Sequence, residues 1–315
     1  MSSTQRQGRP HFASQKAKHR RRRRLAFAAL IVAVVVPTLA LTAFRSSGPS
    51  KADAPAGGRY KGGKVIAKRA RSGSGLVSVS AQRAAVTRLL KLGLPIYCAG
   101  ATGHYVALTF DDGPSEHTPD FLDVLRAAHA RATFFIVGGN MVSEELARNA
   151  RADTKLGALG DHTWTHANLV QLSDADVVDQ IGRAKRAIVA ATHAPVLFFR
   201  PPFAARNSTV ARVAASFGLL QILWNVDSRD WTGQPADTTA NIVLQGLKPG
   251  AIILMHDTRA ESIKALRYTI LPVLKLRGLQ AVTLPELFAL DPPSTEQVRK
   301  DAAAGACSRG QIDQP

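Results

Sequence analysis

The chain has 315 residues and a formal net charge of +18, which leaves room for one good-sized domain with appendages. Residues 1–104 carry 20 Lys and Arg residues and a single acid, Asp53, whereas residues 105–315 carry 21 basic and 22 acidic residues. Because a nucleic-acid binder needs its basic patch on the folded surface, this division excludes a DNA or RNA partner for the larger part of the chain.

The N-terminal segment has the pattern of a membrane anchor. A basic leader, residues 1–24, ends in five consecutive arginines and precedes residues 25–44, which contain no charged side chain. A helix of this length spans roughly 30 Å, the thickness of the hydrocarbon core of a bilayer. Since basic flanks stay cytoplasmic, we expect a single transmembrane helix at the cell membrane with the rest of the chain outside. A cleaved signal peptide, which would give a secreted protein, is the alternative.

Three further segments follow. Residues 45–97 are rich in small and basic residues in their first part and predict a flexible stalk with a short helix near its end. Residues 98–290 predict the catalytic domain, and residues 291–315 predict a C-terminal tail. The two cysteines, Cys98 and Cys307, would tie the ends of the domain together as a disulfide in an extracytoplasmic compartment, or remain two independent thiols.

From residue 105 onward, apolar strand-like runs alternate with helical patterns. The expected strands are 105–110, 133–137, 155–159, 196–199, 220–226, 251–255 and 279–283. The expected helices are 117–130, 141–151, 173–192, 208–217, 238–247 and 261–277. Such alternation implies a parallel sheet covered by helices. We therefore predict an α/β fold, a distorted and incomplete (β/α) barrel of about seven parallel strands.

Six short clusters each follow a strand-like run, where barrel-like α/β enzymes build their sites. They are Thr-Phe-Asp-Asp-Gly-Pro (109–114), Val-Gly-Gly-Asn (137–140), His-Thr-Trp-Thr-His (162–166), Arg-Pro-Pro-Phe (200–203), Asp-Ser-Arg-Asp-Trp (227–231) and Met-His-Asp (255–257). The Val-Gly-Gly-Asn cluster carries no assignable chemistry and is expected only to turn the chain. The other five predict a single site.

Two of these clusters suggest a metal site. His162 and His166 are four residues apart, so both imidazoles would face the same side of a helical turn. Two surface histidines, and an acidic pair that merely caps a turn at 111–112, are the alternative interpretations. Together, a carboxylate and two imidazoles form a typical zinc triad with an open position for water. Zinc is the expected divalent ion, with cobalt and manganese as alternatives.

Five motifs, in the order found here, resemble those of the polysaccharide deacetylase family, the NodB-type domain of carbohydrate esterase family 4. The matching segments are Thr-Phe-Asp-Asp-Gly-Pro, His-Thr-Trp-Thr-His, Arg-Pro-Pro-Phe, Val-Asp-Ser-Arg-Asp-Trp and Ile-Leu-Met-His-Asp. The resemblance covers roughly residues 98–290. It implies a distorted barrel and metal-dependent removal of N- or O-acetyl groups from a polysaccharide.

The resemblance also implies residue roles. Asp112, His162 and His166 would hold the metal. Asp111 would be the general base, and Arg200 would pair with it and keep it in position and ionised. A surface salt bridge is the alternative interpretation of Arg200.

The remaining implied roles concern proton donation and the pocket. His256 would be the general acid, with Asp230 rather than Asp227 against it and raising its pKa. The backbone N–H of Phe203 would stabilise the oxyanion. The pocket for the acetyl methyl would be walled by Trp231, otherwise a core aromatic, and Leu254. Ala204 stands where many family members have Gly, and a positive φ there would strain alanine.

The expected function is therefore N-deacetylation of peptidoglycan or a chitin-like glycan by a monomeric catalytic domain. An O-acetyl esterase acting on acetyl-xylan and a non-catalytic glycan-binding relative are the alternatives. A glycosidase is disfavoured because Asp111 and Asp112, as neighbours on a strand, are expected to project in opposite directions and so not to flank one bond.

Overall fold

The structure is a computed structural model that describes residues 76–309. The predicted leader, the membrane segment at 25–44 and most of the stalk lie outside the described residues. Within residues 76–309, no helix combines the length and apolarity needed to cross a membrane.

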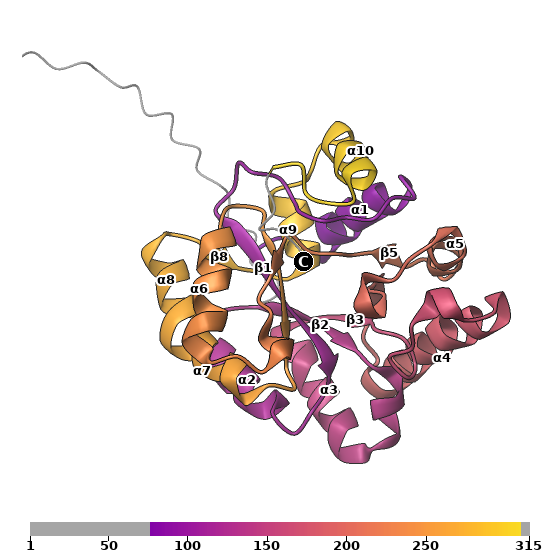
Figure 1. The fold of residues 1–315 in the computed structure, drawn as a ribbon, viewed down its shortest axis with the longest axis horizontal. Coiled ribbons are helices and arrows are strands. Elements are labelled where there is room, and N and C mark those ends of the chain that lie inside the picture. The colour runs from indigo at the N-terminus through magenta and orange to yellow at the C-terminus, as the bar shows by residue number, and fades with distance from the viewer. Residues whose placement is uncertain (1–75, 310–315) are drawn as a thin grey trace, which may run out of the picture. The chain divides into compact units, whose positions relative to one another are not determined.

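The described strands form one parallel sheet with the path β5-β4-β3-β2-β1-β7-β6, and β8 pairs with β1 off this path. The strands are β1 (Tyr105–Gly113), β2 (Ala132–Ile136), β3 (Gly157–Asp161), β4 (Val196–Phe199), β5 (Leu220–Gln221), β6 (Val226–Asp227), β7 (Ile252–His256) and β8 (Gln280–Ala281). The short strands β5 and β6 occupy the two ends of the path. This curled, open arrangement confirms the prediction of an incomplete parallel barrel (Figure 1).

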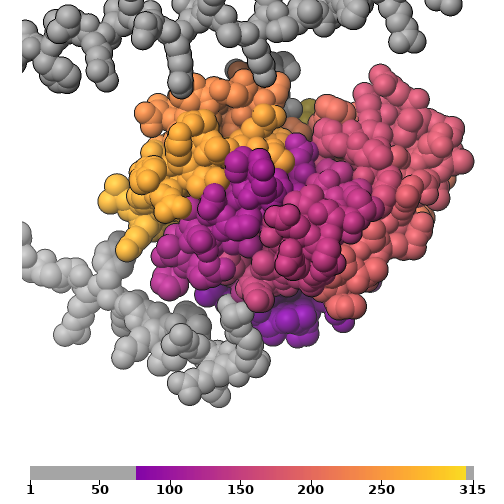
Figure 2. All heavy atoms as spheres, turned by 90° about the horizontal axis from the view of Figure 1, so that it is seen from below, coloured from indigo at the N-terminus to yellow at the C-terminus, as the bar shows by residue number. Residues whose placement is uncertain are grey.

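Helices surround this sheet. They are α1 (Val79–Leu90), α2 (Thr118–Ala127), α3 (Glu144–Leu156), α4 (Asp174–Thr192), α5 (Ser208–Ser216), α6 (Ala236–Gly246), α7 (Ala260–Ala265), α8 (Leu271–Leu276), α9 (Leu284–Leu290) and α10 (Thr295–Ala304). Short 3-10 turns follow several strands: η1 (Gly138–Val142), η2 (Leu169–Gln171), η3 (Pro202–Ala204) and η4 (Asp230–Thr232), while η5 (Leu266–Ile270) is a π-helical turn between α7 and α8. In Figure 1, α1, α9 and α10 gather in one group. Figure 2 shows late parts of the chain, in orange and yellow, beside early parts in purple.

Two element predictions need correction. The expected strand at 155–159 starts at Gly157, because α3 continues through Leu156. The expected strand at 220–226 is two short strands. Between them the chain leaves the β4 edge, where the Ile222 amide donates to the Phe199 carbonyl, and reaches the β7 edge, where the Asn225 amide donates to the Ile252 carbonyl. Continuous apolarity hid this crossing, because burial on all sides leaves no periodicity to read.

Alternation along the strands divides the core into an outer and an inner cluster. On β2, Phe134 packs outward under the helices and Phe135 packs inward; on β7, Met255 packs outward and Leu254 inward. The inner cluster also receives side chains from α1 and α9. Ala107 of β1 belongs to the inner cluster. Since side chains alternate along a strand, every second residue after Ala107, up to the carboxyl end of β1, also points inward.

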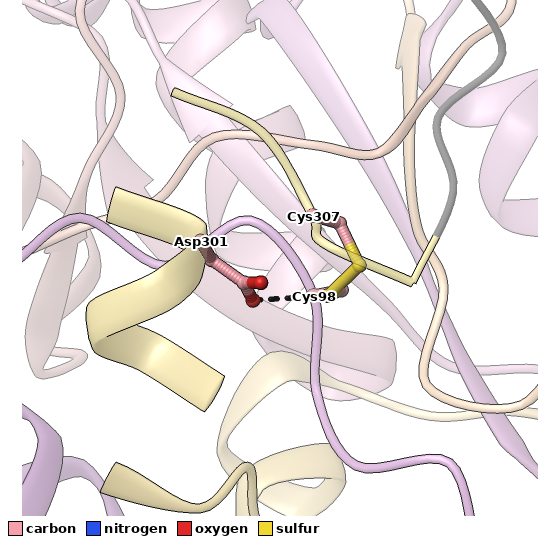
Figure 3. A group of neighbouring side chains, drawn as sticks. All are labelled: Cys98, Asp301 and Cys307. Carbon is pink, nitrogen blue, oxygen red and sulfur yellow. Dashed lines mark hydrogen bonds between the residues drawn. A yellow bond between two sulfur atoms is a disulfide. The ribbon is translucent and has the colours of Figure 1, made fainter. Parts of the chain in front are cut away.

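The packed body extends beyond the predicted range of 98–290 on both sides. Val86 of α1 and Val298 of α10 belong to the inner cluster. Cys98 and Cys307 form a disulfide, and Asp301 of α10 lies beside it (Figure 3). The bridge lies at the amino end of β7, because the Ala99 amide next to Cys98 donates to the Gly250 carbonyl just before that strand.

Candidate active site

The five motif clusters meet in one cleft with a volume of about 500 Å³ at the carboxyl ends of the strands. Its lining residues are Asp111, Asp112, His162, His166, Pro201, Phe203, Ala204, Trp224, Asp227, Trp231, Leu254, His256 and Arg259. These residues lie near the carboxyl ends of β1, β3, β4, β6 and β7 or follow them, and Trp224 follows β5. The cleft is therefore assembled by the strand order, as the barrel prediction required.

Both neighbouring aspartates face this cleft, contrary to the expectation that they project in opposite directions. The β1–β2 register shifts between Phe110 and Gly113, and Asp112 has a left-handed φ of 72°. Such a bulge re-aims a side chain that regular pleating would turn away. Asp111 Oδ2 and Asp112 Oδ1 consequently lie 3.7 and 3.5 Å from the same atom, His162 Nε2. The opposite-face argument against a glycosidase therefore no longer holds. What disfavours that alternative is that His162, which both carboxylates approach, would have no role in it.

The two histidines also come together, but not on a helix. Residues 162–166 form a loop after β3 in which Thr163 and His166 have left-handed φ values of 68° and 58°. The ring centroids of His162 and His166 are 5.0 Å apart. The predicted proximity is therefore produced by a strained loop and not by helical spacing.

Asp112, His162 and His166 offer ligand atoms within 4.8 Å of one another. Asp112 Oδ1 is 3.3 Å from His166 Nε2 and 3.5 Å from His162 Nε2. Two ligands of a tetrahedral zinc ion, each about 2.0–2.1 Å from it, lie about 3.3 Å apart. The spacing of these three atoms thus fits a zinc-sized ion.

The hydrogen bonds around the triad support the same fit. His162 Nδ1 lies 2.7 Å from the carbonyl oxygen of Arg200; because a carbonyl only accepts, Nδ1 carries the proton and Nε2 keeps its lone pair. Asp112 Oδ1 is buried and accepts no hydrogen bond within the described residues. Without a metal, burial raises the pKa of Asp112, but the imidazoles of His162, His256 and His166, when protonated, would hold it well below its usual value. The residues present therefore suit a divalent metal.

Arg200 holds the other aspartate. Its Nη1 donates to Asp111 Oδ1 at 2.7 Å and to Thr109 Oγ1 at 2.8 Å, and Thr109 Oγ1 in turn donates to the Ile253 carbonyl at 2.6 Å. The guanidinium is completely buried and lies 4.2 Å over the Phe135 ring, so it is not a surface salt bridge. Burial lowers the pKa of Arg200, while Asp111 opposes that shift.

His256 is coupled to a second buried carboxylate. Its Nδ1 is 2.7 Å from Asp230 Oδ1, and its backbone N–H donates to Asp230 Oδ2 at 2.8 Å. Ser262 on α7 donates to the same Oδ2 at 2.5 Å. Although burial lowers the pKa of His256, the hydrogen bond and charge of Asp230 raise it to about 9. Asp227 instead accepts the Arg229 amide at 2.9 Å, so Asp230 is the partner of His256.

The remaining predicted residues form the walls. Leu254 is buried at the floor, whereas Trp231 is 48 % exposed and Phe203 is 68 % exposed, so Trp231 is not a core aromatic. The rings of Phe203 and His166 pack edge to face, with their centroids 4.7 Å apart. Phe203 and Ala204 have left-handed φ values of 59° and 53°, so the positive φ considered for Ala204 is present.

The sequence analysis missed Trp224 and Arg259, which line the cleft, and two residues that hydrogen-bond to its charged groups. Thr109 lies inside the first motif, two residues before Asp111 on the same inward row, and the alternation of β1 offers a signal for it. Ser262 lies 32 residues beyond Asp230 in the chain. It has no local pattern, because only the packing of α7 brings it to the site.

Comparisons with known proteins agree with this geometry. A family model described as polysaccharide deacetylase matches residues 99–222. A chitooligosaccharide deacetylase of Bradyrhizobium sp. (strain ANU 289) is 36% identical over 199 residues, which cover 58% of this chain and 90% of that protein. A peptidoglycan-N-acetylglucosamine deacetylase of Listeria monocytogenes is 36% identical over 189 residues, covering 59% of this chain but only 39% of the Listeria protein.

Solved structures show the same fold. A CE4 family pseudoenzyme from Bacillus anthracis aligns with a TM-score of 0.58 and 32% sequence identity, covering 64% of this chain and 70% of that chain. The fold and the sequence thus match the same group of proteins. The chain belongs to the polysaccharide deacetylase family.

Proposed function

We propose that the chain is a metal-dependent hydrolase that removes N-acetyl groups from a cell-envelope or extracellular glycan of N-acetylglucosamine, such as peptidoglycan or a chitin-like polymer. One observation carries the proposal: a single cleft holds the Asp112–His162–His166 triad together with the buried Asp111–Arg200 and Asp230–His256 pairs. Two relatives whose names refer to chitooligosaccharide and to peptidoglycan support this substrate class.

A divalent metal, with zinc proposed first and cobalt or manganese as alternatives, would be held by the carboxylate and two imidazoles of the triad. When bound there, it would polarise the acetyl carbonyl and lower the pKa of a water molecule toward neutrality. The buried, hydrogen-bonded ligand set supplies the fixed geometry that such chemistry needs.

The chain's own residues would supply the proton transfers. Asp111 accepts a proton from the attacking water, and Arg200 fixes the orientation of its carboxylate. His256, charged through its contact with Asp230, donates a proton to the departing amine nitrogen. The amide of Phe203 stabilises the negative oxygen of the tetrahedral intermediate. The side chains of Leu254 and Trp231 enclose the acetyl methyl.

A non-catalytic glycan-binding role is the second candidate, because the aligned Bacillus anthracis structure is of a pseudoenzyme. The presence of both Asp111 and His256 in hydrogen-bonded positions favours catalysis, since binding alone needs neither a base nor an acid. An Asp111→Asn variant separates the two: it abolishes turnover in an enzyme and leaves the affinity of a pure binder nearly unchanged.

The test is acetate release from peptidoglycan, chitin oligomers and acetyl-xylan, measured with the metal-loaded chain before and after chelation. Acetate from either amino-sugar substrate, lost on chelation and restored by zinc, is the expected result. Release from acetyl-xylan alone would favour an O-acetyl esterase. No acetate from any of the three, from a folded and metal-loaded sample, would overturn the proposal.

We also propose that the catalytic domain acts outside the cytoplasm as a monomer, attached to the membrane through residues 25–44 or secreted after cleavage. The uncharged run after a basic leader and a disulfide of a kind that persists in oxidising compartments support this location. Cell fractionation with sequencing of the N-terminus distinguishes the two forms: an intact leader in the membrane fraction indicates an anchor. Recovery of the chain in the cytoplasm with reduced cysteines would contradict both.

A further inference from the structure

The Val-Gly-Gly-Asn segment at 137–140, which follows β2, is bonded to the turn that carries Asp112. Asn140 Nδ2 lies 3.2 Å from each of three successive carbonyl oxygens, those of Asp112, Gly113 and Pro114. A side-chain amide nitrogen carries two N–H donors, so at least one of them is shared between two of these three carbonyls. The backbone of the turn is thereby fixed at the residue whose carboxylate enters the metal triad.

The same segment also holds the loop that carries the two histidines. The amide of Gly138 donates to the Thr163 carbonyl at 2.9 Å, and the amide of Gly139 donates to the Trp164 carbonyl at 2.8 Å. Both acceptors lie between His162 and His166 in the chain. A Cβ at position 138 would stand 2.5 Å from Ala184 Cα, and one at position 139 would stand 2.8 Å from the Trp164 carbonyl oxygen. Glycine is therefore required at both positions for this close approach.

These two loops need external support because their backbones are strained. Asp112, Thr163 and His166 all have left-handed φ values, between 58° and 72°. Residues other than glycine persist in this region only where the surroundings hold them. The bonds from residues 138–140 end on the carbonyls of two of these three residues and their neighbours, so the segment is placed to hold both strained loops in one arrangement.

We propose that Asn140 is a positioning residue of the metal site, which holds the Asp112 turn so that its carboxylate converges with His162 and His166. The inference rests on the proposed function, since it concerns the same site. It makes the 137–140 segment part of the machinery and not merely a turn. Asn140 is not among the described residues that line the cleft, so it acts through the turn that carries Asp112.

The chain offers a matched control. Asn149 on α3 donates its Nδ2 to the Ser115 carbonyl at 3.0 Å, which is the same kind of bond to the same loop, one residue beyond the carbonyls held by Asn140. If Asn140 only stabilised the loop, then Asn140→Ala and Asn149→Ala would have similar consequences. If it positions a ligand, only Asn140→Ala should change metal binding.

The experiment measures the zinc affinity of the full chain by competition with a chromophoric chelator, and the visible absorption spectrum of the cobalt-loaded form. Asn140→Ala is expected to weaken zinc binding about 10–100-fold, the range found for residues that orient metal ligands, and to change the cobalt spectrum. Asn149→Ala is expected to leave the spectrum unaltered and the affinity within about 3-fold, well below that range. Urea unfolding of the metal-free chains shows whether the two variants lose similar stability.

If Asn140→Ala does not fold, Asn140→Ser replaces it, because the serine hydroxyl keeps a donor with a shorter reach. A zinc affinity of Asn140→Ser below that of Asn149→Ala would then support the proposal. A zinc affinity of Asn140→Ser between those of the wild type and Asn149→Ala would contradict it. Equal zinc affinity and identical cobalt spectra in the Asn140 and Asn149 variants would overturn the inference while leaving the proposed function standing. A folded wild-type chain that binds no divalent metal would overturn the proposed function and the inference together.

Discussion

Asp111 and His256 are register partners on the adjacent parallel strands β1 and β7. Partners on parallel strands project to the same face of the sheet, so both side chains end inward-facing rows at the mouth of the barrel. They are held from different sides, Asp111 by Arg200 after β4 and His256 by Asp230 after β6. Adjacent strands thus carry two titratable groups with opposite partners, an arrangement that separates a base from an acid.

Replacing Asp111 by Asn should abolish most catalysis without emptying the metal site. Loss of a general base typically costs about 10²–10⁴-fold in rate, and Asp111 is not among the three triad residues. The measurement is kcat for acetate release together with zinc content per chain. Asp123→Asn, on the exposed face of α2, serves as the control and should retain full activity. An Asp111→Asn chain with near-normal kcat would assign the base elsewhere.

The protonation of His256 should depend on Asp230. The pKa of about 9 lies above the ordinary value of about 6.5, so the charged pair stabilises the fold fully below pH ~6.5, and this contribution is lost as the pH rises through about 9. Removing the carboxylate by Asp230→Asn leaves burial, which lowers the pKa, as the main influence. The pKa of His256 should then fall toward or below its ordinary value.

This dependence can be read from the imidazole signals of the metal-free chain in an NMR titration. Asp227→Asn is the matched control, because among the described residues Asp227 accepts the Arg229 amide and acts on His256 only through its charge. It should lower the pKa of His256 much less than Asp230→Asn does. A wild-type His256 that titrates near neutrality would contradict the charged general acid.

The strand-end residues could be predicted from sequence, because apolar runs identify strands and barrel topology brings their carboxyl ends together. The backbone conformations that direct these side chains into the cleft could not be predicted from the sequence. Asp112 and His166 adopt left-handed conformations, and η1, which is distant from both in the sequence, donates hydrogen bonds to the turn and the loop that contain them. The opposite-face expectation for Asp112 failed for this reason, and so did the helical expectation for the two histidines.

Elements without a periodic hydrophobic pattern could not be predicted from the sequence either. The crossing at 222–225 lies within one continuous apolar run, so nothing in it separates β5 from β6. The helix α10 has only two buried residues, Val298 and Asp301, too few to distinguish it from a polar tail. In both places tertiary pairing decides the structure, and local preference does not.

Changing Ala204 to Gly should stabilise the fold. Alanine at a φ of 53° pays the left-handed penalty of about 1–2 kcal/mol, whereas glycine does not. Part of that gain is lost to the greater freedom of glycine in the unfolded chain, so a net gain of about 0.5–1 kcal/mol is expected. Ala205→Gly is the control: its φ is −70°, and glycine there should cost about 0.5–1 kcal/mol. The free energy of unfolding in urea should therefore rise in Ala204→Gly and fall in Ala205→Gly. An equal decrease in both variants would show that Ala204 is not strained.

Removing the disulfide should lower stability but not the turnover of folded molecules. Cys98 and Cys307 are separated by 209 positions, and cross-links closing long loops contribute about 2–5 kcal/mol. The Ala99 amide next to Cys98 donates to the Gly250 carbonyl, just before β7, so the bridge lies at the strand ends opposite the cleft. The double variant Cys98→Ala/Cys307→Ala should therefore unfold at lower urea concentration while kcat per folded chain is unchanged. Reductant should reproduce this loss in the wild type and have no effect on the double variant; a wild-type chain whose unfolding is insensitive to reductant would show that the bridge does not stabilise the fold.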